Sequence, residues 1–522
     1  MRRPAAWSPT VLGILSGAVG VLSIGSALTP SLANRVDLVQ GVLPPGLPEI
    51  ARWVALAFGL ALVWLAGSLS RGKRRAWQLA VVLVAGVAIA HLVKGLDAEE
   101  AGLSLALLVA LVVGRKHFDV PGDPDIRPLV LNAVALGSLL GVLFLYELHE
   151  SLVPDDLINV LTATATLLSF RALYLWLRSW REDETPNAHD RARARTLVEN
   201  HGSDTLAYFS LRRDKSYFFS PSRRSFLAYG VFGGIALVSG DPVGDTGEFQ
   251  ALLQSFRAEA RGRGWRVAIL NASRELLPLY RGVGFRALKV GDEAVVRTAD
   301  FSLDGRSIRK VRQSVSRLRR VGYTASVLGE ADLTAALRTE LQEVSEEWRG
   351  SWPERGFSMA MDELFGDSGT LFVIARDADG RVGGFLHLVP SPASGGYSLS
   401  AMRRLRETPN GLMEFLVVEA LDWTRINGAS EVSLNFCVFA DLLRAGDHSL
   451  SGRLARHGLQ SLDRVFQLER LLSFTGKFFP EWRPRFLCVE RLSDFPLVGL
   501  AYLRAESLLT PPGPWTRLRR AA

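Results

Sequence analysis

The sequence predicts a multi-pass α-helical membrane region followed by a cytosolic region of the α/β class. Before about residue 180 the chain consists of long uncharged apolar runs separated by short charged loops. After it, the mixed strand and helix patterns of an ordinary globular protein begin. The 522 residues are 48% hydrophobic, and the mean hydropathy of +0.15 is high for a protein that lies wholly in water. Part of the chain is therefore expected in lipid.

Six apolar runs form the predicted membrane region, residues 1–180. Most of them approach the roughly 20 residues that a helix needs to cross a bilayer. The fourth run is short, and the sixth contains Arg171, which could reach toward the headgroups or face a neighbouring helix. The runs are residues 11–28, 53–69, 76–93, 101–113, 129–146 and 158–177.

The distribution of basic residues predicts the orientation of these spans in a cell membrane. Because short basic loops stay in the cytoplasm, an even number of spans places both ends of the region there. Residues 1–33 could instead be a secretory signal, since Ser31-Leu32-Ala33 resembles a cleavage site, but further apolar runs follow at once and favour an uncleaved span. Alternate loops are mainly acidic, and Lys and Arg gather near residues 2–3, 71–75, 115–127 and 178–181.

The cytosolic part begins after a polar linker, residues 181–204. Strand and helix patterns follow in two rounds of similar order, which predicts an internally duplicated fold. The first round covers residues 205–300, the second residues 301–495, and a tail covers residues 496–522. The expected strands are residues 206–211, 217–220, 225–238, 266–271, 285–290, 294–297, 323–328, 370–376, 382–389, 397–402 and 431–436, and the expected helices are residues 249–263, 333–348 and 411–426.

Several catalytic signatures are missing from the sequence. It contains no phosphate-binding loop, no dinucleotide fingerprint and no zinc-protease motif. Only Cys437 and Cys488 are present, and the eight histidines are scattered, so no metal site and no cofactor are expected. The nearest approach to a serine-hydrolase elbow is Gly356-Phe-Ser-Met-Ala360, which lacks the final glycine. An esterase is therefore disfavoured.

Residues 309–320 form a basic segment with helical periodicity. Six of its twelve residues are Lys or Arg, and none is acidic. Val311, Val315 and Leu318 recur at helical spacing and share one face. Such a helix can contact RNA phosphates or anionic lipid headgroups, with Arg317, Arg319 and Arg320 as candidates. A solvated helix face is the alternative.

Two further clusters contain charged residues next to predicted turns. In Gly240-Asp-Pro-Val-Gly-Asp245, either aspartate could cap the next helix, and capping is the favoured interpretation for Asp245. Lys289 and Glu293 lie close to a predicted strand turn, where a surface ion pair is the simplest interpretation.

An ordered set of motifs between Leu206 and Leu487 resembles the catalytic domain of the MprF-type aminoacyl-phosphatidylglycerol synthases. The resemblance implies a tandem pair of GNAT-like acyltransferase domains. It also implies transfer of an aminoacyl group from aminoacyl-tRNA to phosphatidylglycerol or a related anionic lipid. The motifs are Phe218-Phe-Ser-Pro221, Gly240-Asp-Pro-Val-Gly-Asp245, Gly284-Phe285, Lys289-Val-Gly-Asp-Glu-Ala294, Glu354-Arg-Gly-Phe-Ser-Met359, Met402-Arg-Arg404, Asn410-Gly411 and Lys477-Phe-Phe-Pro-Glu-Trp482.

This resemblance suggests roles for individual residues. Arg403 or Arg404 would hold the lipid phosphate through a forked contact, and Lys477 could do so as a point charge. Glu293 and Asp241 are candidates for binding the amino acid's ammonium group or assisting proton transfer. Substrate contacts are also expected from Lys289, Asn410 and Trp482.

The sequence departs from the family pattern at Ser400, where an acidic residue is expected two positions before Met402-Arg403. An altered donor, an altered acceptor or lost activity would follow if that carboxylate takes part in the reaction. The membrane region is shorter than the family's flippase region, and no tRNA synthetase module follows Leu487, so lipid flipping is not expected. The alternatives are an acyl-CoA-dependent N-acyltransferase, whose pyrophosphate loop has no clean match, and a membrane sensor without activity.

Overall fold

A computed structural model describes residues 8–29, 46–95, 97–148, 155–180, 186–202, 204–350, 352, 356–392, 394–438 and 468–509. The chain divides into two compact units. The first contains residues 1–181 with residues 258–265, and the second contains residues 182–257 and 266–522. The cleavage-like site at residues 31–33, the start of the predicted linker at residues 181–185 and the tail beyond residue 509 lie outside the described residues.

The first unit contains one helix at each of the six predicted apolar runs. Within the described residues, α1, α3, α4 and α7 are long and apolar enough to cross a membrane, whereas α5 has only 16 residues. These four helices support a membrane protein, and the predicted count of six spans stays a prediction. The helices are α1 (Pro9–Leu28), α3 (Leu47–Leu69), α4 (Arg74–Gly95), α5 (Ala98–Val113), α6 (Arg127–Leu148) and α7 (Asp155–Leu177).

Glycines allow α1 and α3 to approach closely. A Cβ atom placed on Gly20 would lie 2.7 Å from the Gly59 carbonyl oxygen, and one on Gly59 would lie 2.9 Å from the Gly20 carbonyl oxygen. Small residues of this kind let backbones touch where lipid offers no hydrophobic driving force for helix association.

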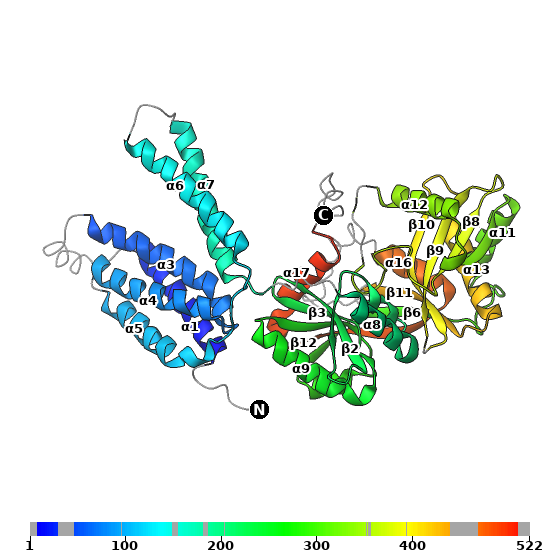
Figure 1. Ribbon diagram of the computed structural model, residues 1–522, viewed down its shortest axis with the longest axis horizontal. Coiled ribbons are helices and arrows are strands. Elements are labelled where there is room, and N and C mark those ends of the chain that lie inside the picture. Colours follow the sequence, from blue (N-terminus) through cyan, green and yellow to red (C-terminus); the bar gives the residue numbers. More distant parts are fainter. Residues whose placement is uncertain are drawn as a thin grey trace. The chain divides into compact units, whose positions relative to one another are not determined.

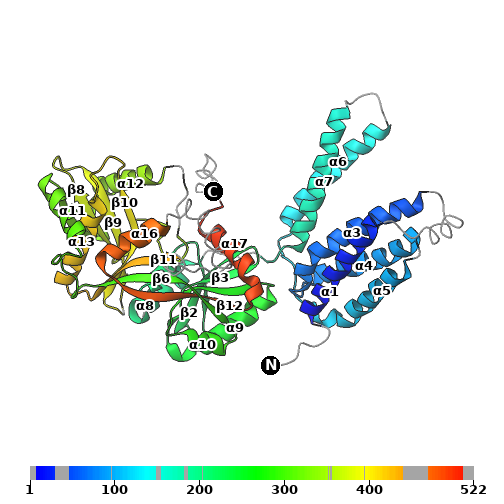
Figure 2. The same cartoon turned by 180° about the vertical axis from the view of Figure 1, so that it is seen from behind.

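In the described part of the second unit, one sheet of twelve strands forms the core, and helices pack on it (Figures 1 and 2). Its order is β1-β2-β3-β5-β12-β6-β11-β10-β9-β8-β7, with β4 paired to β2. The strands are β1 (Ser216–Phe219), β2 (Ser225–Phe232), β3 (Ile235–Ser239), β4 (Val243–Gly244), β5 (Arg266–Ala272), β6 (Arg286–Arg297), β7 (Thr324–Gly329), β8 (Leu371–Arg376), β9 (Val382–Ser391), β10 (Gly396–Arg404), β11 (Glu431–Val438) and β12 (Glu481–Val489).

The sheet confirms the predicted duplication. In the first half, helix α9 (Phe249–Gly262) connects the parallel strands β3 and β5, and α10 (Leu277–Gly282) leads into β6. In the second half, α13 (Leu412–Ile426) connects the parallel strands β10 and β11, and α16 (Leu468–Thr475) precedes β12. Each half places its last strand inside the other, because β12 lies between β5 and β6 while β6 lies between β12 and β11. The two halves therefore share one continuous sheet.

Helices cover both faces of this sheet. In the second half, α11 (Arg309–Arg320) and α13 pack on one face, and α12 (Ala335–Arg349) packs on the other. In the first half, α8 (Ala188–His201) and α17 (Phe495–Ala505) bury apolar side chains against the sheet. The predicted linker thus contains a packed helix, because Ala194, Leu197 and Val198 of α8 enter the core.

Three strand predictions were wrong in detail. Residues 206–211 do not form a strand, since Ala207–Leu211 is a buried 3-10 helix. The long strand predicted over residues 225–238 is the hairpin β2–β3, which turns at Gly233 and Gly234, both with positive φ. Residues 285–297 form one strand rather than two, because β6 pairs with β12 and β11 along its length.

Candidate active site

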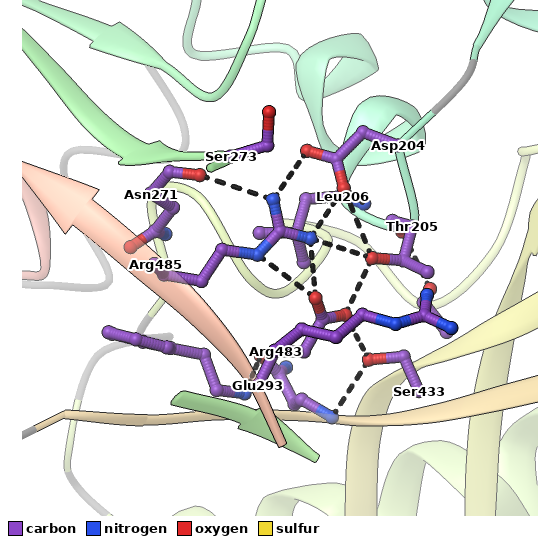
Figure 3. Close-up of polar contacts among 12 residues, drawn as sticks. Asp204, Thr205, Leu206, Asn271, Ser273, Glu293, Ser433, Arg483 and Arg485 are labelled. Atoms are coloured by element: carbon purple, nitrogen blue, oxygen red, sulfur yellow. Dashed lines mark hydrogen bonds and ion pairs between the residues drawn. The ribbon is translucent and has the colours of Figure 1, made fainter. Parts of the chain in front are cut away.

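A buried cluster of charged side chains lies where β6 and β12 run side by side (Figure 3). The Arg485 guanidinium on β12 donates through Nε to Oε2 of Glu293 at 3.0 Å and through Nη1 to Oδ2 of Asp204 at 2.8 Å. The other Glu293 oxygen, Oε1, accepts the hydroxyls of Thr205 and Ser433. We call these five residues the central network. Glu293 is fully buried, and Arg485 is nearly so.

The charged groups of the central network are paired with one another. Burial opposes the charge of Arg485, but the Asp204 and Glu293 carboxylates raise its pKa above the ordinary value, so the cation is permanent. Both Glu293 oxygens already accept hydrogen bonds from the protein. The geometry therefore suits Glu293 to positioning Arg485 and Thr205. Sequence reasoning identifies Glu293 but misses Arg485 and Asp204, because these contacts close over 192 and 281 residues.

Asp241 lies in a pocket next to the central network. Gly240, with φ of 84°, turns the chain at the end of β3, and the Asp241 carboxylate accepts from the Tyr280 hydroxyl at 2.6 Å and from the Ser273 amide. Burial and the neighbouring Asp204 charge raise the pKa of Asp241 to about 6. The pocket is lined by Asp204, Leu206, Ala207, Ser210, Ser239, Gly240, Asp241, Pro242 and Val243.

The chemistry of this pocket favours a cation. Burial and the Asp204 charge both disfavour the ionised form of Asp241, so a positive group bound next to this carboxylate would be stabilising. Within the described residues, the buried Ser210 hydroxyl has no hydrogen-bond partner. The buried Lys215 amine donates to the hydroxyl of Ser239, which lines the pocket, and to the Phe209 carbonyl, both at 2.6 Å. Asp245 lies outside this pocket and caps the following turn through the Gly247 amide, as predicted.

The parallel strands separate at an asparagine in each half of the sheet. Pairing of β3 with β5 ends at Leu270, before Asn271, and pairing of β10 with β11 ends at Ser433, before Asn435. Both asparagines have positive φ, 53° and 75°. Their side-chain amides donate to neighbouring residues of one segment, to the Ser358 hydroxyl at 2.8 Å and to the Met359 carbonyl at 2.6 Å. The duplicated fold thus places two equivalent asparagines next to the same segment.

Arg403 lies on β10, beyond the point at which this strand stops pairing with β11. It is half-buried and pairs in register with Phe385, two residues from His387 on the same strand. His387 is buried and stacks on Phe372, and neither of its ring nitrogens has a hydrogen-bond partner among the described residues. Burial and then the charge of Arg403 lower the pKa of His387 to about 3, so this imidazole is neutral.

Ser400 occupies a β-bulge of β10, between Leu399 and Ala401. Its side chain is buried, and its hydroxyl accepts the Met361 amide at 3.0 Å. The departure from the family pattern therefore lies inside the sheet, on the strand that carries Arg403.

The remaining predicted substrate contacts lie apart from the central network. Lys289 pairs with Asp292 at 2.8 Å, so the predicted Lys289–Glu293 pair is wrong, because both residues belong to one continuous strand and Glu293 is buried with Arg485. Arg404 donates to the Thr408 hydroxyl at 3.1 Å. Lys477 pairs with Glu414 at 2.7 Å.

Trp482 and Asn410 belong to the α13 side of the sheet. Trp482 packs against the core cluster that α11 and α13 form with the strands. Asn410 is exposed just before α13 and accepts a hydrogen bond from Arg317 through its carbonyl. Lys477 reaches the first turn of α13 through Glu414.

Helix α11 confirms the predicted amphipathic pattern. Val311, Val315 and Leu318 are buried, as predicted. Arg320 is exposed, and Arg319 pairs with Glu419 at 2.8 Å. The apolar side of α11 is thus packed in the core, while its basic side is exposed.

We expect replacement of Arg317, Arg319 and Arg320 by Ala to weaken tRNA binding. Fewer released counterions should lower the slope of log affinity against log salt by about two to three. Filter binding across a salt series measures this slope. The control of equal charge replaces the exposed Arg274, Arg286 and Arg381, and an equal loss there would show that only net charge matters.

In the part of the chain that the structure describes, no group of three or more His, Cys, Asp and Glu side chains could hold a metal ion.

Comparison with known proteins supplies the relationship. Residues 195–489 match the sequence profile described as phosphatidylglycerol lysyltransferase, C-terminal. The lysylphosphatidylglycerol biosynthesis bifunctional protein LysX of Rhodococcus jostii is 32% identical over 97% of this chain and 49% of its own length. The LysX protein of Mycobacterium tuberculosis H37Rv is 31% identical over 97% of this chain and 47% of its own length. The chain thus spans about half the length of these relatives.

Two solved structures share the fold of the second unit. The C-terminal domain of a lysylphosphatidylglycerol synthetase from Agrobacterium fabrum is 29% identical, with a TM-score of 0.53, and covers 60% of this chain and 96% of that domain. L-PGS from Bacillus licheniformis is 24% identical, with a TM-score of 0.56, and covers 63% of this chain and all of that structure. The predicted tandem acyltransferase fold is thereby confirmed.

Proposed function

Because this chain belongs to the family of phosphatidylglycerol lysyltransferase C-terminal domains, we propose that it is a membrane-bound aminoacyltransferase. It moves a lysyl or similar aminoacyl group from aminoacyl-tRNA to a hydroxyl of phosphatidylglycerol or a related anionic lipid, which changes the surface charge of the membrane. The observation that carries the proposal is the Asp204–Asp241 pocket beside the central network. An aminoacyl group brings an ammonium ion to the reaction, and the pocket offers it the Asp241 carboxylate, while Asp204, which is paired with Arg485, adds a negative charge beside it.

The proposed reaction needs positioning more than driving force. An aminoacyl-tRNA is an activated ester, so the lipid hydroxyl oxygen can bond to its carbonyl carbon while the bond to the ribose oxygen breaks. The hydroxyl proton passes to the leaving ribose oxygen through a protein group, and Asp241, with a pKa of about 6, has the proton affinity of a general acid–base group. Glu293 acts as a positioning residue, because it holds Arg485 against Asp204.

The lipid phosphate requires a fixed cation. Arg403 is half-buried next to a neutral imidazole, so no adjacent histidine charge competes with it for an anion. A guanidinium can bind a phosphate diester through two parallel hydrogen bonds. The proposed binding region extends to three residues near the start of α13, namely Arg404, Asn410 and Lys477. Two further proposed contacts lie on neighbouring strands, Lys289 on β6 and Trp482 on β12.

We propose that the catalytic unit faces the cytoplasm, where charged tRNA is found. The basic loops of the first unit support this orientation. Reporter fusions after Arg75 and after Arg181 should both give a cytoplasmic signal. An extracytoplasmic signal from the second fusion would separate the catalytic unit from its proposed donor.

The activity should depend on the ionisation of Asp241. Since an ammonium ion binds the carboxylate form, we expect kcat/KM for the aminoacyl donor to rise with pH and level off above about 6. Asp241→Asn should remove this limb and lower kcat/KM by about 10- to 100-fold, as expected for a lost charge-assisted hydrogen bond. Asp245→Asn, the control, should keep the limb.

The same carboxyl group links pH to stability. Its pKa is raised in the folded chain relative to about 3.9 in an unfolded chain, so the folded chain binds the proton more tightly. The contribution of Asp241 to the free energy of unfolding should therefore fall as pH rises from about 4 to about 6. Thermal unfolding of wild type and Asp241→Asn across this range measures the difference, and parallel pH curves would contradict it.

A direct assay tests the proposed function. The full chain is reconstituted in vesicles containing phosphatidylglycerol and supplied with tRNA charged with radiolabelled lysine. We expect label in the lipid fraction, and ribonuclease treatment of the tRNA before the assay should abolish it. Parallel reactions contain acetyl-CoA in place of charged tRNA. Consumption of acetyl-CoA without aminoacyl-lipid formation would overturn the proposal in favour of an N-acyltransferase.

A further inference from the structure

Helix α17 is apolar on almost every side, although only one side packs against the protein. Val498, Ala501 and Ala505 are buried in a core cluster with residues of β3, β5 and β12. The opposite side is accessible, and a helix that is apolar all round is normally covered. The exposed fractions of the large apolar side chains are 48% for Leu492, 43% for Phe495, 44% for Leu497, 42% for Leu500 and 48% for Leu509.

The charges of this segment all point to one kind of partner. Its acidic residues, Asp494 and Glu506, are buried; Asp494 pairs with Arg266, and Glu506 accepts the Phe357 amide at 3.0 Å. Its exposed charged residues are Arg491 and Arg504. The surface formed by Leu492, Phe495, Leu497, Leu500 and Leu509 with these two arginines, named here the α17 face, is therefore apolar and cationic without an exposed carboxylate.

Outside this segment, the exposed large apolar residues described in the second unit lie singly or as one pair. Val321, Ile426 and Phe479 follow or end separate elements, and Trp348 and Trp352 form a pair at the end of α12. Single exposed apolar residues are common, but a group of them on one segment marks an interaction site. The α17 face is such a group.

We infer that the α17 face inserts into the interfacial region of an anionic bilayer. The same chain carries helices that are long and apolar enough to span a membrane, so the second unit would be tethered to the bilayer that they cross. Residues 510–522, which follow the helix in the sequence, contain Trp515, Arg517, Arg519 and Arg520 and no acidic residue. Leucine, tryptophan and arginine without acids are the composition of segments that lie in the membrane interface.

This inference goes beyond aminoacyl transfer and does not depend on it. Helix α17 packs on β2 and β3, and β3 leads directly into the Asp241 pocket. Insertion of the α17 face would hold this half of the sheet at the membrane surface, which contains the acceptor lipid of the proposed reaction. The inferred surface therefore assigns a membrane contact to the second unit in addition to the spanning helices of the first.

Site-specific fluorescence tests the insertion. The full chain with Cys437→Ser keeps only Cys488, which is fully buried, and Leu500→Cys then adds one label site for an environment-sensitive dye. The chain is reconstituted in vesicles of phosphatidylglycerol and phosphatidylcholine with or without doxyl-labelled lipid. We expect quenching by the doxyl lipid and protection from iodide. The matched control is Ile426→Cys, which is 79% exposed at the end of α13, and its dye should be quenched by iodide only.

Three results would overturn the inference. Quenching of the Leu500→Cys dye by iodide alone would show that the α17 face remains in water. Protection from both quenchers would show that protein covers it, either another part of this chain or a second copy. Equal doxyl quenching in vesicles of phosphatidylcholine alone, together with no effect of Arg491→Glu and Arg504→Glu, would remove the anionic preference.

An activity measurement separates this inference from the proposed function. Leu497→Ser with Leu500→Ser should raise KM for vesicle lipid while leaving kcat with saturating detergent-dispersed lipid unchanged. Doxyl quenching in a chain that makes no aminoacyl lipid would leave the inference standing and overturn only the function. Aminoacyl lipid formation without doxyl quenching would do the reverse.

Discussion

Arg485→Met should lower the free energy of unfolding by about 3–5 kcal/mol, the cost of breaking a buried ion pair. The substitution removes the cation that Glu293 and Asp204 share and leaves two carboxylates close together in the protein interior. Thermal and denaturant unfolding of the full chain in detergent, followed by tryptophan fluorescence, measures the loss. The same variant should lack aminoacyl transfer, because the pocket next to Asp204 loses its support.

A matched pair of variants shows whether burial is the reason. Arg297 on β6 pairs with Glu481, and both side chains are about half exposed, so Arg297→Met should cost about 1 kcal/mol or less. Combining Arg485→Met with Glu293→Gln and Asp204→Asn removes the stranded charges and should recover part of the stability. A small effect of Arg485→Met, equal to that of Arg297→Met, would mean that the network is hydrated and contributes little.

Arg403→Ala should reduce aminoacyl transfer by about 100-fold, and this is the largest expected loss of activity without loss of fold. The loss corresponds to about 3 kcal/mol, the upper range for a hydrogen bond to a charged group. Arg403→Lys keeps the charge but not the forked geometry and should fall between Ala and wild type. Initial rates at varied phosphatidylglycerol concentration separate binding from the chemical step.

The control for Arg403 is Arg406→Ala, an exposed arginine just beyond the end of β10. Its rate should equal that of wild type. An equal loss in both variants would show that any positive charge near the end of β10 has the same effect. Unchanged activity in Arg403→Ala would exclude Arg403 from phosphate binding.

Ser400→Asp restores the carboxylate that the family pattern places on this strand. An aspartate in the bulge can still accept the Met361 amide, so we expect the variant to fold. We also expect higher transfer from lysyl-tRNA, because the variant regains the carboxylate that the family pattern has on the strand that carries Arg403. No gain with any aminoacyl-tRNA would show that the serine belongs to a site that does not need this carboxylate.

Much of the fold could be predicted from local patterns. Val311, Val315 and Leu318 recur at helical spacing, and they are the residues that α11 buries. The order of strands and helices indicated a duplication, and the sheet confirms it. Sequence patterning also located a helix at each of the six apolar runs, among the residues that the structure describes. Such predictions succeed because burial of one face imposes a period on neighbouring residues.

Local patterns failed where the environment of a segment is set by distant strands. Residues 206–211 have the apolar composition of a strand, yet they form a buried 3-10 helix. Lys289 and Glu293 suggested a surface pair, yet Glu293 points into the interior because β12 lies against β6. The spacing of apolar residues within either segment does not indicate which distant strand packs against it.

The sequence by itself determined the membrane region, the α/β class, the duplication and the family, since each depends on composition, period or an ordered set of motifs. Only the tertiary structure decided how the candidate site is built. Arg485, Asp204 and Ser433 come together because each half of the sheet places its last strand inside the other. Burial of both faces of the shared strands stabilises this arrangement. A charge buried there requires a partner, and the partners of Arg485 lie 192 and 281 residues away in sequence. Contact between such residues is a property of the whole sheet and leaves no mark on the local sequence.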